Sequence, residues 1–213
     1  MTNSTLICTL GGQPQIVTFA LDYLLARAER IREVFVLYVL PADGRVDRSL
    51  RKLYAEFKDG TYRGQACQFQ ARAIRQAGHV LPGIRTAAEA EQVRQTVFSL
   101  IADLKRANRS LHLCIAGGPR MMGLMALSAS MLHCGHEDKV WHIYTEPNFL
   151  EQVRDGAVMH DETGERVQLV QVPLVPWGAY FPNFSLIAHT PAEALTAQVA
   201  WLDQDERRRC QAV

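Results

Sequence analysis

The sequence contains the same short pattern twice, and this repeat constrains the fold more than any other feature. In each copy an apolar run ends in Gly-Gly, a proline follows within two residues, and apolar residues then recur at helical spacing. The copies cover residues 4–25 and 111–132. Short apolar runs bounded by turn residues predict buried strands, and proline is well tolerated at the start of a helix. Strand, tight turn and helix in this order form the unit of a parallel α/β sheet.

The remaining periodicity extends this unit into a larger sheet. An apolar run at 34–40 follows the first helical segment, which we place at 15–32, and a long segment at 86–107 has its apolar positions on one side of a helix. We therefore predict an α/β fold with a Rossmann-like, doubly wound, mainly parallel sheet. Further expectations are a short helix at 48–57, no assignment for 60–83, strands at 139–145 and 167–172, an irregular segment at 173–184 and a helix at 192–208.

We divide the chain into one domain and a C-terminal extension. Residues 1–150 are predicted to form the Rossmann-like domain. The alternation of helix and strand fades after Glu146, and the remainder is too short for an independent domain. Residues 151–213 are therefore expected to form a short irregular and helical extension packed on the same domain.

Composition limits the possible partners. Lys and Arg number 23 against 22 Asp and Glu, which gives a formal net charge of +1. Because proteins that coat long nucleic acid are usually strongly basic, no long nucleic acid is expected as a partner, whereas a small anion held locally is compatible. The five cysteines lack paired spacing, and we identify neither a secretory leader nor a membrane-length apolar run. We therefore expect a cytoplasmic protein without a membrane partner. The run 133–136 lacks a second ligand pair, so no metal site is predicted.

The two glycine turns indicate where a ligand binds. In a doubly wound sheet, ligands lie outside the carboxyl ends of the strands, where the strand order reverses. Glycines let backbone N–H groups approach a ligand closely, and the helices that follow direct their positive ends to the same place, so we predict an anion-binding cradle. The pattern is neither G-x-G-x-x-G nor G-x-x-x-x-G-K-[ST], which argues against a dinucleotide fingerprint and a Walker loop. The polar side chains just inside the two turns are Gln13 and Arg120.

Three segments resemble the CARF (CRISPR-associated Rossmann fold) proteins. Residues 9–18 (TLGGQPQIVT) are similar to their first motif, residues 115–123 (IAGGPRMMG) to their second, and residues 139–144 (KVWHIY) to the strand that follows. The likeness is strongest to the small stand-alone CARF proteins of type III CRISPR systems. It implies a homodimer that binds a cyclic oligoadenylate across its two-fold axis, without a cofactor. In the ring nucleases of the family, it also implies metal-independent cleavage to linear di-adenylates with 2′,3′-cyclic phosphate, which switches off type III CRISPR signalling.

The resemblance assigns catalytic roles to Arg120 and Gln13. Ring nucleases of the family often carry a lysine and a hydroxyl residue at these positions. Arg120 can hold a phosphate bidentately, whereas Gln13 can donate a hydrogen bond but cannot act as a general base. Binding therefore transfers from the family more directly than cleavage does. The residues expected to contact the ligand are Thr9, Gly11, Gly12, Gln15, Gly117, Gly118, Pro119, Met121, His142 and Thr145, with His142 facing either the pocket or the core.

Two other functions stay open at this point. One is a non-catalytic sensor of the same ligand that regulates a separate partner, and the other is an unrelated nucleotide-binding enzyme on a Rossmann-like sheet. The aromatic residues Trp177, Tyr180 and Phe181 are expected either to stack on adenines as a flap or to fill the edge of the core. The basic residues after the second strand are interpreted as a solvated face: Arg45, Arg48 and Arg51.

Overall fold

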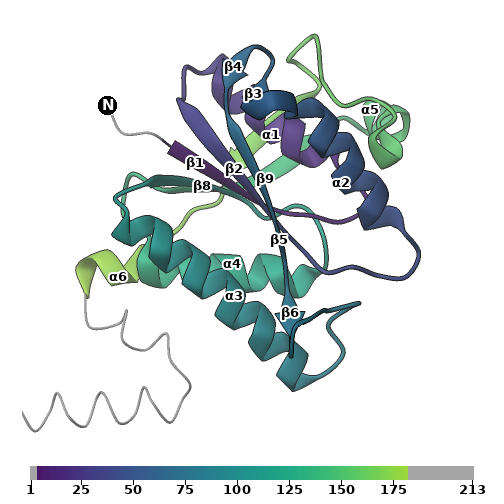
Figure 1. Cartoon of the computed structure of the whole chain (residues 1–213). Helices are drawn as coiled ribbons and strands as arrows, with labels where there is room; N and C mark the ends of the chain where they lie inside the picture. The colour runs from purple at the N-terminus through teal and green to yellow at the C-terminus, as the bar shows by residue number, and fades with distance from the viewer. Residues whose placement is uncertain (1–3, 182–213) are drawn as a thin grey trace, which may run out of the picture.

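The computed structural model of the chain describes residues 4–181, and its centre is a six-stranded sheet in the order β10-β9-β8-β1-β2-β5 (Figure 1). Neighbouring strands are parallel, except that β10 runs antiparallel to β9. The strands of this sheet are β1 (Ser4–Thr9), β2 (Ile31–Tyr38), β5 (Gln68–Ala73), β8 (Ser110–Cys114), β9 (Lys139–Thr145) and β10 (Val167–Gln171). The helices are α1 (Gln15–Ala26), α2 (Arg45–Glu56), α3 (Ala87–Arg106), α4 (Arg120–His133), α5 (Pro147–Gln152) and α6 (Trp177–Tyr180). Shorter elements are η1 (Lys58–Gly60), η2 (Arg154–Gly156), and the paired strands β3 (Thr61–Tyr62) with β4 (Gln65–Ala66) and β6 (Arg75–Gln76) with β7 (His79–Val80).

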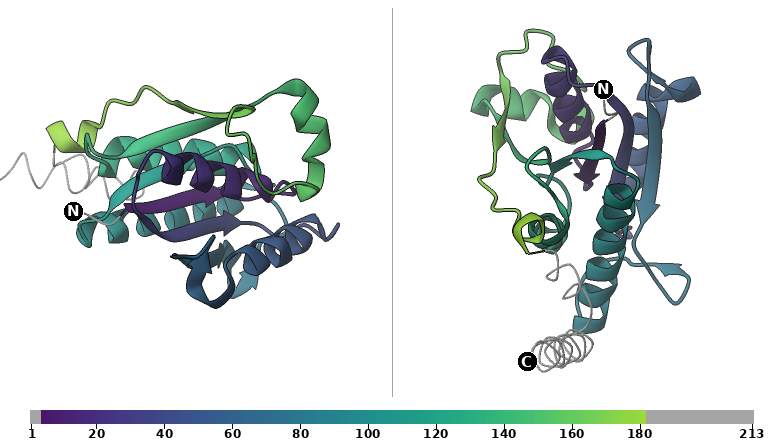
Figure 2. Two further views of the ribbon diagram at one scale, coloured as in Figure 1. Left: turned by 90° about the horizontal axis from the view of Figure 1, so that it is seen from above. Right: turned by 90° about the vertical axis from the view of Figure 1, so that its left-hand side faces the viewer.

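Helices cover both faces of the sheet, which gives three layers (Figure 1, Figure 2). Side chains alternate along β1, because successive strand residues point to opposite faces. Leu6 and Cys8 pack in the cluster that contains residues of α1 and α2, whereas Ile7 packs in the cluster built with α3 and α4. The apolar run of β1 is therefore buried on both sides, as in the central strand of a parallel sheet. The predicted α/β, Rossmann-like, doubly wound and mainly parallel sheet is confirmed.

The strand order reverses between β1 and β8. From β1 the chain continues through α1 to β2 on one side, while β8 lies on the other side of β1 and continues through α4 to β9. The turns that follow β1 and β8 consequently leave the same edge of the sheet at adjacent positions. This is the place where doubly wound sheets bind ligands.

Several boundaries differ from the sequence-based predictions. The first helix ends at Ala26 rather than near residue 32, because the chain turns through Ala28, whose φ is 62°, and β2 already begins at Ile31. The helix expected at 48–57 begins three residues earlier, after Gly44. The main omission is β5, which lies in the segment left unassigned. As an edge strand with alternating exposed and half-buried residues, β5 contains no apolar run.

The C-terminal part contains more regular structure than expected. The short helix α5 follows β9 directly, and α6 lies within the segment expected to be irregular. The strand predicted at 167–172 is present as β10, but it is antiparallel to its neighbour. The helix expected at 192–208 lies outside the described residues.

The described part of the extension shares the core of the domain. The boundary placed at residue 150 falls inside α5, and β10 continues the main sheet beside β9. Phe149 and Val153 pack with Phe19 of α1 and with Val167 in one buried cluster. Residues 151–181 therefore belong to the same sheet and the same hydrophobic interior as the preceding chain.

The connecting segment, residues 154–166, is tied to α1 and α2 by side chains of those helices. Lys52 of α2 donates from Nζ to the carbonyl oxygens of Asp155 and Gly156, at 2.9 and 2.8 Å. Thr18 of α1 donates from Oγ1 to the carbonyl oxygen of Met159. These contacts hold the start of the connecting segment against the beginning of α1 and the second half of α2.

His160 of this segment contacts two carboxylates, and we expect these contacts to make the stability of the fold depend on pH. Its Nδ1 lies 2.8 Å from Asp22 Oδ2, and its Nε2 lies 3.1 Å from Glu56 Oε2. Both nitrogens can donate only in the imidazolium form. The hydrogen bond to Asp22 raises the pKa of His160, against the opposing effect of burial. Stability from His160 is therefore fully present below about pH 6.5, the ordinary pKa of histidine, and is lost as the pH rises through the raised pKa of the folded state.

We expect His160→Gln to lower the free energy of unfolding more at pH 6 than at pH 9, and chemical denaturation of both proteins measures this difference. His79→Gln is the matched control, because His79 is exposed on β7. An equal loss at both pH values would show that the imidazolium does not contribute.

Candidate functional site

The two glycine turns are packed against each other so tightly that neither tolerates a Cβ atom. A Cβ on Gly117 would lie 2.1 Å from the carbonyl oxygen of Thr9, and a Cβ on Gly118 would lie 2.8 Å from that of Leu10. A Cβ on Gly11 would lie 2.9 Å from the backbone nitrogen of Gly118, which itself has a φ of 70°. The repeated Gly-Gly pattern therefore has a steric cause, which is the close contact of two turns at the switch point of the sheet.

The backbone donors at these turns are not used within the fold. Among residues 4–181, the N–H groups of the four turn glycines donate no hydrogen bond. The helices that follow the turns, α1 and α4, have neither a side-chain cap nor an acidic residue in the first turn. By contrast, α3 begins with a complete capping box formed by Thr86 and Glu89. Because uncapped helix starts attract anions, this end of the sheet is suited to a negatively charged ligand.

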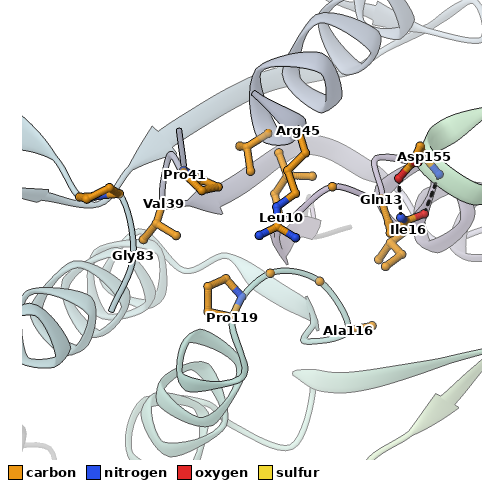
Figure 3. A pocket seen from close by; sticks show the side chains of 16 residues that line it. Leu10, Gln13, Ile16, Val39, Pro41, Arg45, Gly83, Ala116, Pro119 and Asp155 are labelled. Atoms are coloured by element: carbon orange, nitrogen blue, oxygen red, sulfur yellow. Dashed lines mark hydrogen bonds between the residues drawn. The ribbon is translucent and has the colours of Figure 1, made fainter. Parts of the chain in front are cut away.

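A pocket of about 510 Å³ opens over the two turns (Figure 3). This volume falls in the range of sites for small organic ligands. One wall is apolar and comes from the ends of β2 and the loop before α3, while the polar groups Arg45, Gln13 and Asp155 lie elsewhere on the rim. The lining residues are Leu10, Gly11, Gly12, Gln13, Ile16, Val39, Pro41, Arg45, Val46, Pro82, Gly83, Ala116, Gly117, Gly118, Pro119 and Asp155.

Arg45 is the one cation among the described residues that line this pocket, which corrects its interpretation as part of a solvated face. It is the first residue of α2, directly after Gly44, whose φ of 71° turns the chain back over the sheet edge. Its Cδ lies 3.1 Å from the position that a Cβ on Gly12 would occupy, and its Nε pairs with Asp43 at 2.9 Å. More than half of its side chain is exposed. Arg45 follows β2, the parallel strand beside β1, after a short loop. This place in the chain was the signal that could have indicated a side chain of the pocket.

Gln13 is held in a two-way contact with a residue far away in the sequence. Its Nε2 donates to Asp155 Oδ1 at 2.9 Å, and its Oε1 accepts from the backbone N–H of Asp155 at 2.9 Å. The same Oε1 accepts from Gln15 Nε2 at 2.7 Å. The two partners Gln13 and Asp155 are 142 residues apart, so no local pattern could have revealed Asp155 as part of the site.

Of the other predicted site residues, some line this pocket and others do not. Gly11, Gly12, Gly117, Gly118 and Pro119 line it together with Gln13. Thr9 and Gln15 are buried and do not line the pocket. Within residues 4–181, Thr9 Oγ1 and Gln15 Oε1 have no hydrogen-bond partner, whereas Gln15 Nε2 donates to Gln13 Oε1. The remaining four do not line the pocket of a single chain: Arg120 is exposed at the first position of α4, Met121 follows it, and His142 and Thr145 lie on β9.

The C-terminal aromatic residues lie apart from this pocket. Trp177 and Phe181 line a different, apolar cavity of about 690 Å³ together with Ser128, Met131 and Leu132. Tyr180 contacts the ring of His136 edge-on, with 5.3 Å between ring centroids. In a single chain these side chains pack on and around α4 and do not cover the glycine turns.

Within residues 4–181, no cluster of three or more His, Cys, Asp or Glu side chains is arranged to hold a metal ion. None of the helices in that range combines the length and the apolar character needed to cross a bilayer.

Comparisons with known proteins place these features in context. A family model described as CRISPR-associated protein NE0113 matches residues 13–204. No curated protein matches the chain. Among solved structures, the chain is similar to one described as "Structure of a Type III CRISPR defence DNA nuclease activated by cyclic oligoadenylate", with 17% identity and a TM-score of 0.47. That match covers 88% of this chain but only 23% of the other, so the chain spans less than a quarter of that protein.

Proposed function

The chain belongs to the family of CRISPR-associated protein NE0113, and from this premise we propose that it binds a cyclic oligoadenylate and cleaves the ring. The proposed ligand is cyclic tetra-adenylate, bound at the interface of a homodimer. The products are linear di-adenylates that end in 2′,3′-cyclic phosphate, and their formation requires no metal ion. The resemblance of residues 9–18 and 115–123 to the CARF motifs supports this assignment.

One observation carries the proposal more than any other. Two closely packed glycine turns, whose backbone N–H groups donate no hydrogen bond within residues 4–181, line a pocket together with two uncapped helix starts and Arg45. Backbone donors and helix starts bind phosphate oxygens without a specific side chain, and an arginine adds a charged fork of donors. The apolar wall formed by Val39, Pro41 and Pro82 suits the face of a base.

The size of the pocket supports a dimer. At about 510 Å³ it suits part of a tetranucleotide ring better than the whole ring. A two-fold axis would place a second, identical cradle opposite the first, which matches a ring of four equivalent nucleotides. Each chain would then hold one half of the ligand.

Cleavage of such a ring needs alignment rather than a protein nucleophile. The ribose 2′-oxygen attacks the adjacent phosphorus in line with the bond to the 5′-oxygen, which breaks. Holding these atoms in line and stabilising the charge on the phosphate are the two contributions that a protein makes. Arg120, at the start of α4, is proposed to contact the reacting phosphate from the rim of the pocket, and Gln13 to maintain the opposite wall.

A sensor without cleavage is the second candidate, and a specific observation favours it. Both polar atoms of the Gln13 amide are already engaged by Asp155 and Gln15, and Arg120 does not line the pocket of one chain. The groups suited to binding are thus in place in a single chain. Of the two residues assigned to cleavage, Gln13 has its Oε1 and one N–H of Nε2 already engaged, and Arg120 lies outside the lining of the pocket.

Incubation with a mixture of cyclic oligoadenylates in EDTA, followed by mass spectrometry, separates these functions and identifies the ring size. We expect the four-membered ring to disappear and di-adenylates with 2′,3′-cyclic phosphate to accumulate. Tight binding without any product would favour the sensor. Binding of mononucleotides or dinucleotides with none of the cyclic ligands would contradict both functions.

A further inference from the structure

We propose that Asp155 accepts the hydrogen bond of the attacking ribose 2′-hydroxyl and then its proton. This inference rests on the proposed ring cleavage and adds to it the group that activates the nucleophile. Asp155 is the one carboxylate among the described residues that line the pocket, as Arg45 is the one cation. No other acidic side chain of residues 4–181 reaches that cavity.

The carboxylate is oriented with one oxygen held and the other available. Oδ1 accepts a hydrogen bond from Gln13 Nε2 at 2.9 Å, and the backbone N–H of Asp155 donates to Gln13 Oε1 at the same distance. Within residues 4–181, Oδ2 receives no hydrogen bond. Figure 3 shows this pair on one side of the pocket and Arg45 reaching toward the turns from α2. Since Asp155 lines the pocket, Oδ2 is the oxygen of its carboxylate that is left to accept a hydrogen bond from a ligand.

The backbone around Asp155 is fixed at some conformational cost. Asp155 has a φ of 55°, a conformation that only a few residue types adopt readily, aspartate and asparagine among them. The next residue, Gly156, has a φ of 71°, and a Cβ there would lie 2.6 Å from Pro14 Cγ at the start of α1. Lys52 holds the carbonyl oxygens of both residues. The turn is thus locked against the helix that follows the first glycine turn.

The chemistry of the ligand explains a carboxylate at this position. A carboxylate repels phosphate, so a pocket that bound only phosphates would be weakened by it. A ribose hydroxyl, by contrast, is a hydrogen-bond donor that acidic residues bind in nucleotide sites. Asp155 therefore suits the sugar, while the glycine turns and Arg45 suit the phosphate.

The proposed step balances without an added reactant. The 2′-oxygen forms a bond to phosphorus as its proton passes to Asp155 Oδ2, and the bond from phosphorus to the 5′-oxygen breaks. The 5′-oxygen takes a proton from water, and Asp155 returns its proton to the solvent. The result is a linear oligoadenylate with a 2′,3′-cyclic phosphate and a free 5′-hydroxyl.

The decisive variant is Asp155→Asn. Asparagine tolerates the positive φ and keeps an oxygen for the Gln13 contact, but it cannot take up the proton. Under single-turnover conditions we expect ring opening to slow by about 10²- to 10⁴-fold, the usual contribution of a general base. Affinity for the intact ring should change much less than the rate, because the variant loses one hydrogen bond to the 2′-hydroxyl but also removes a negative charge from the pocket. The control is Glu151→Gln, since Glu151 is exposed on α5 and does not line the pocket.

The outcomes separate this inference from the proposed function. Wild-type cleavage together with an undiminished rate for Asp155→Asn would overturn the role of Asp155 and leave ring cleavage standing. A parallel loss of ring affinity and thermal stability would also overturn it, because it would indicate a structural role. If the wild-type chain bound no ring or left it intact, ring cleavage itself would fail, and the inference with it.

Discussion

Gly117→Ala is expected to destabilise the fold and to abolish ligand binding together. The added Cβ would lie 2.1 Å from the carbonyl oxygen of Thr9 and 3.0 Å from its carbonyl carbon. Neither atom belongs to a flexible side chain, so one of the two turns must move. Overpacking of this kind usually costs about 1–3 kcal/mol, and a clash with backbone falls at the upper end. Moving the turn would also misdirect the N–H groups that are proposed to bind phosphate.

Chemical denaturation and a titration with labelled cyclic tetra-adenylate measure these two effects. Gly83→Ala is the control for stability, because Gly83 lines the same pocket while a Cβ there would meet nothing within 4 Å. Its stability should match that of the wild type or exceed it slightly. If Gly117→Ala were as stable as Gly83→Ala and bound the ring normally, the close packing of the turns would not be what shapes the site.

Two arginines are expected to give different losses. Arg45 lines the pocket in each chain, so Arg45→Ala should weaken binding of the ring by roughly 10- to 100-fold, the effect of a lost charged hydrogen bond. Arg120 is the first residue of α4 and does not line the pocket of a single chain, and its proposed role is in the reaction. Arg120→Ala should therefore slow ring opening by roughly 10²- to 10³-fold, with a smaller effect on binding.

Equilibrium titration and single-turnover kinetics distinguish the two roles. Arg48→Ala serves as the control, because Arg48 is exposed on the same helix as Arg45 but does not line the pocket. An unchanged single-turnover rate for Arg120→Ala would remove it from the mechanism. An affinity of Arg45→Ala equal to that of Arg48→Ala would mean that the phosphates bind elsewhere.

The sequence was most informative where a local residue pattern, such as an apolar run or a Gly-Gly pair, coincides with a fixed place in the sheet. The apolar runs of β1 and β8 are buried strands, and the glycines after them fix the place where the strand order reverses, so the fold and the floor of the pocket were predictable. The strand β5 was missed because an edge strand exposes alternate residues and has no continuous apolar run. The segment left unassigned also contributes Pro82 and Gly83 to the pocket, so this part of its wall was not predicted either.

The walls of the pocket were less predictable than its floor. Arg45 resembles its exposed neighbours in sequence, and only the turn at Gly44 brings it over the glycines. Asp155 reaches Gln13 across 142 residues, through a connection that depends on how α5 and β10 pack on the sheet. His142 and Thr145 were expected at the site from a motif, yet β9 is the second strand from β1 and carries them away from the pocket of a single chain.

The central claim is tested most directly by the fate of one ring under single-turnover conditions. Protein in excess over labelled cyclic tetra-adenylate is incubated in EDTA, and the products are resolved over time. We predict complete conversion to linear di-adenylate with 2′,3′-cyclic phosphate in the absence of any metal ion. A ring that remains intact after hours with saturating protein would contradict the account.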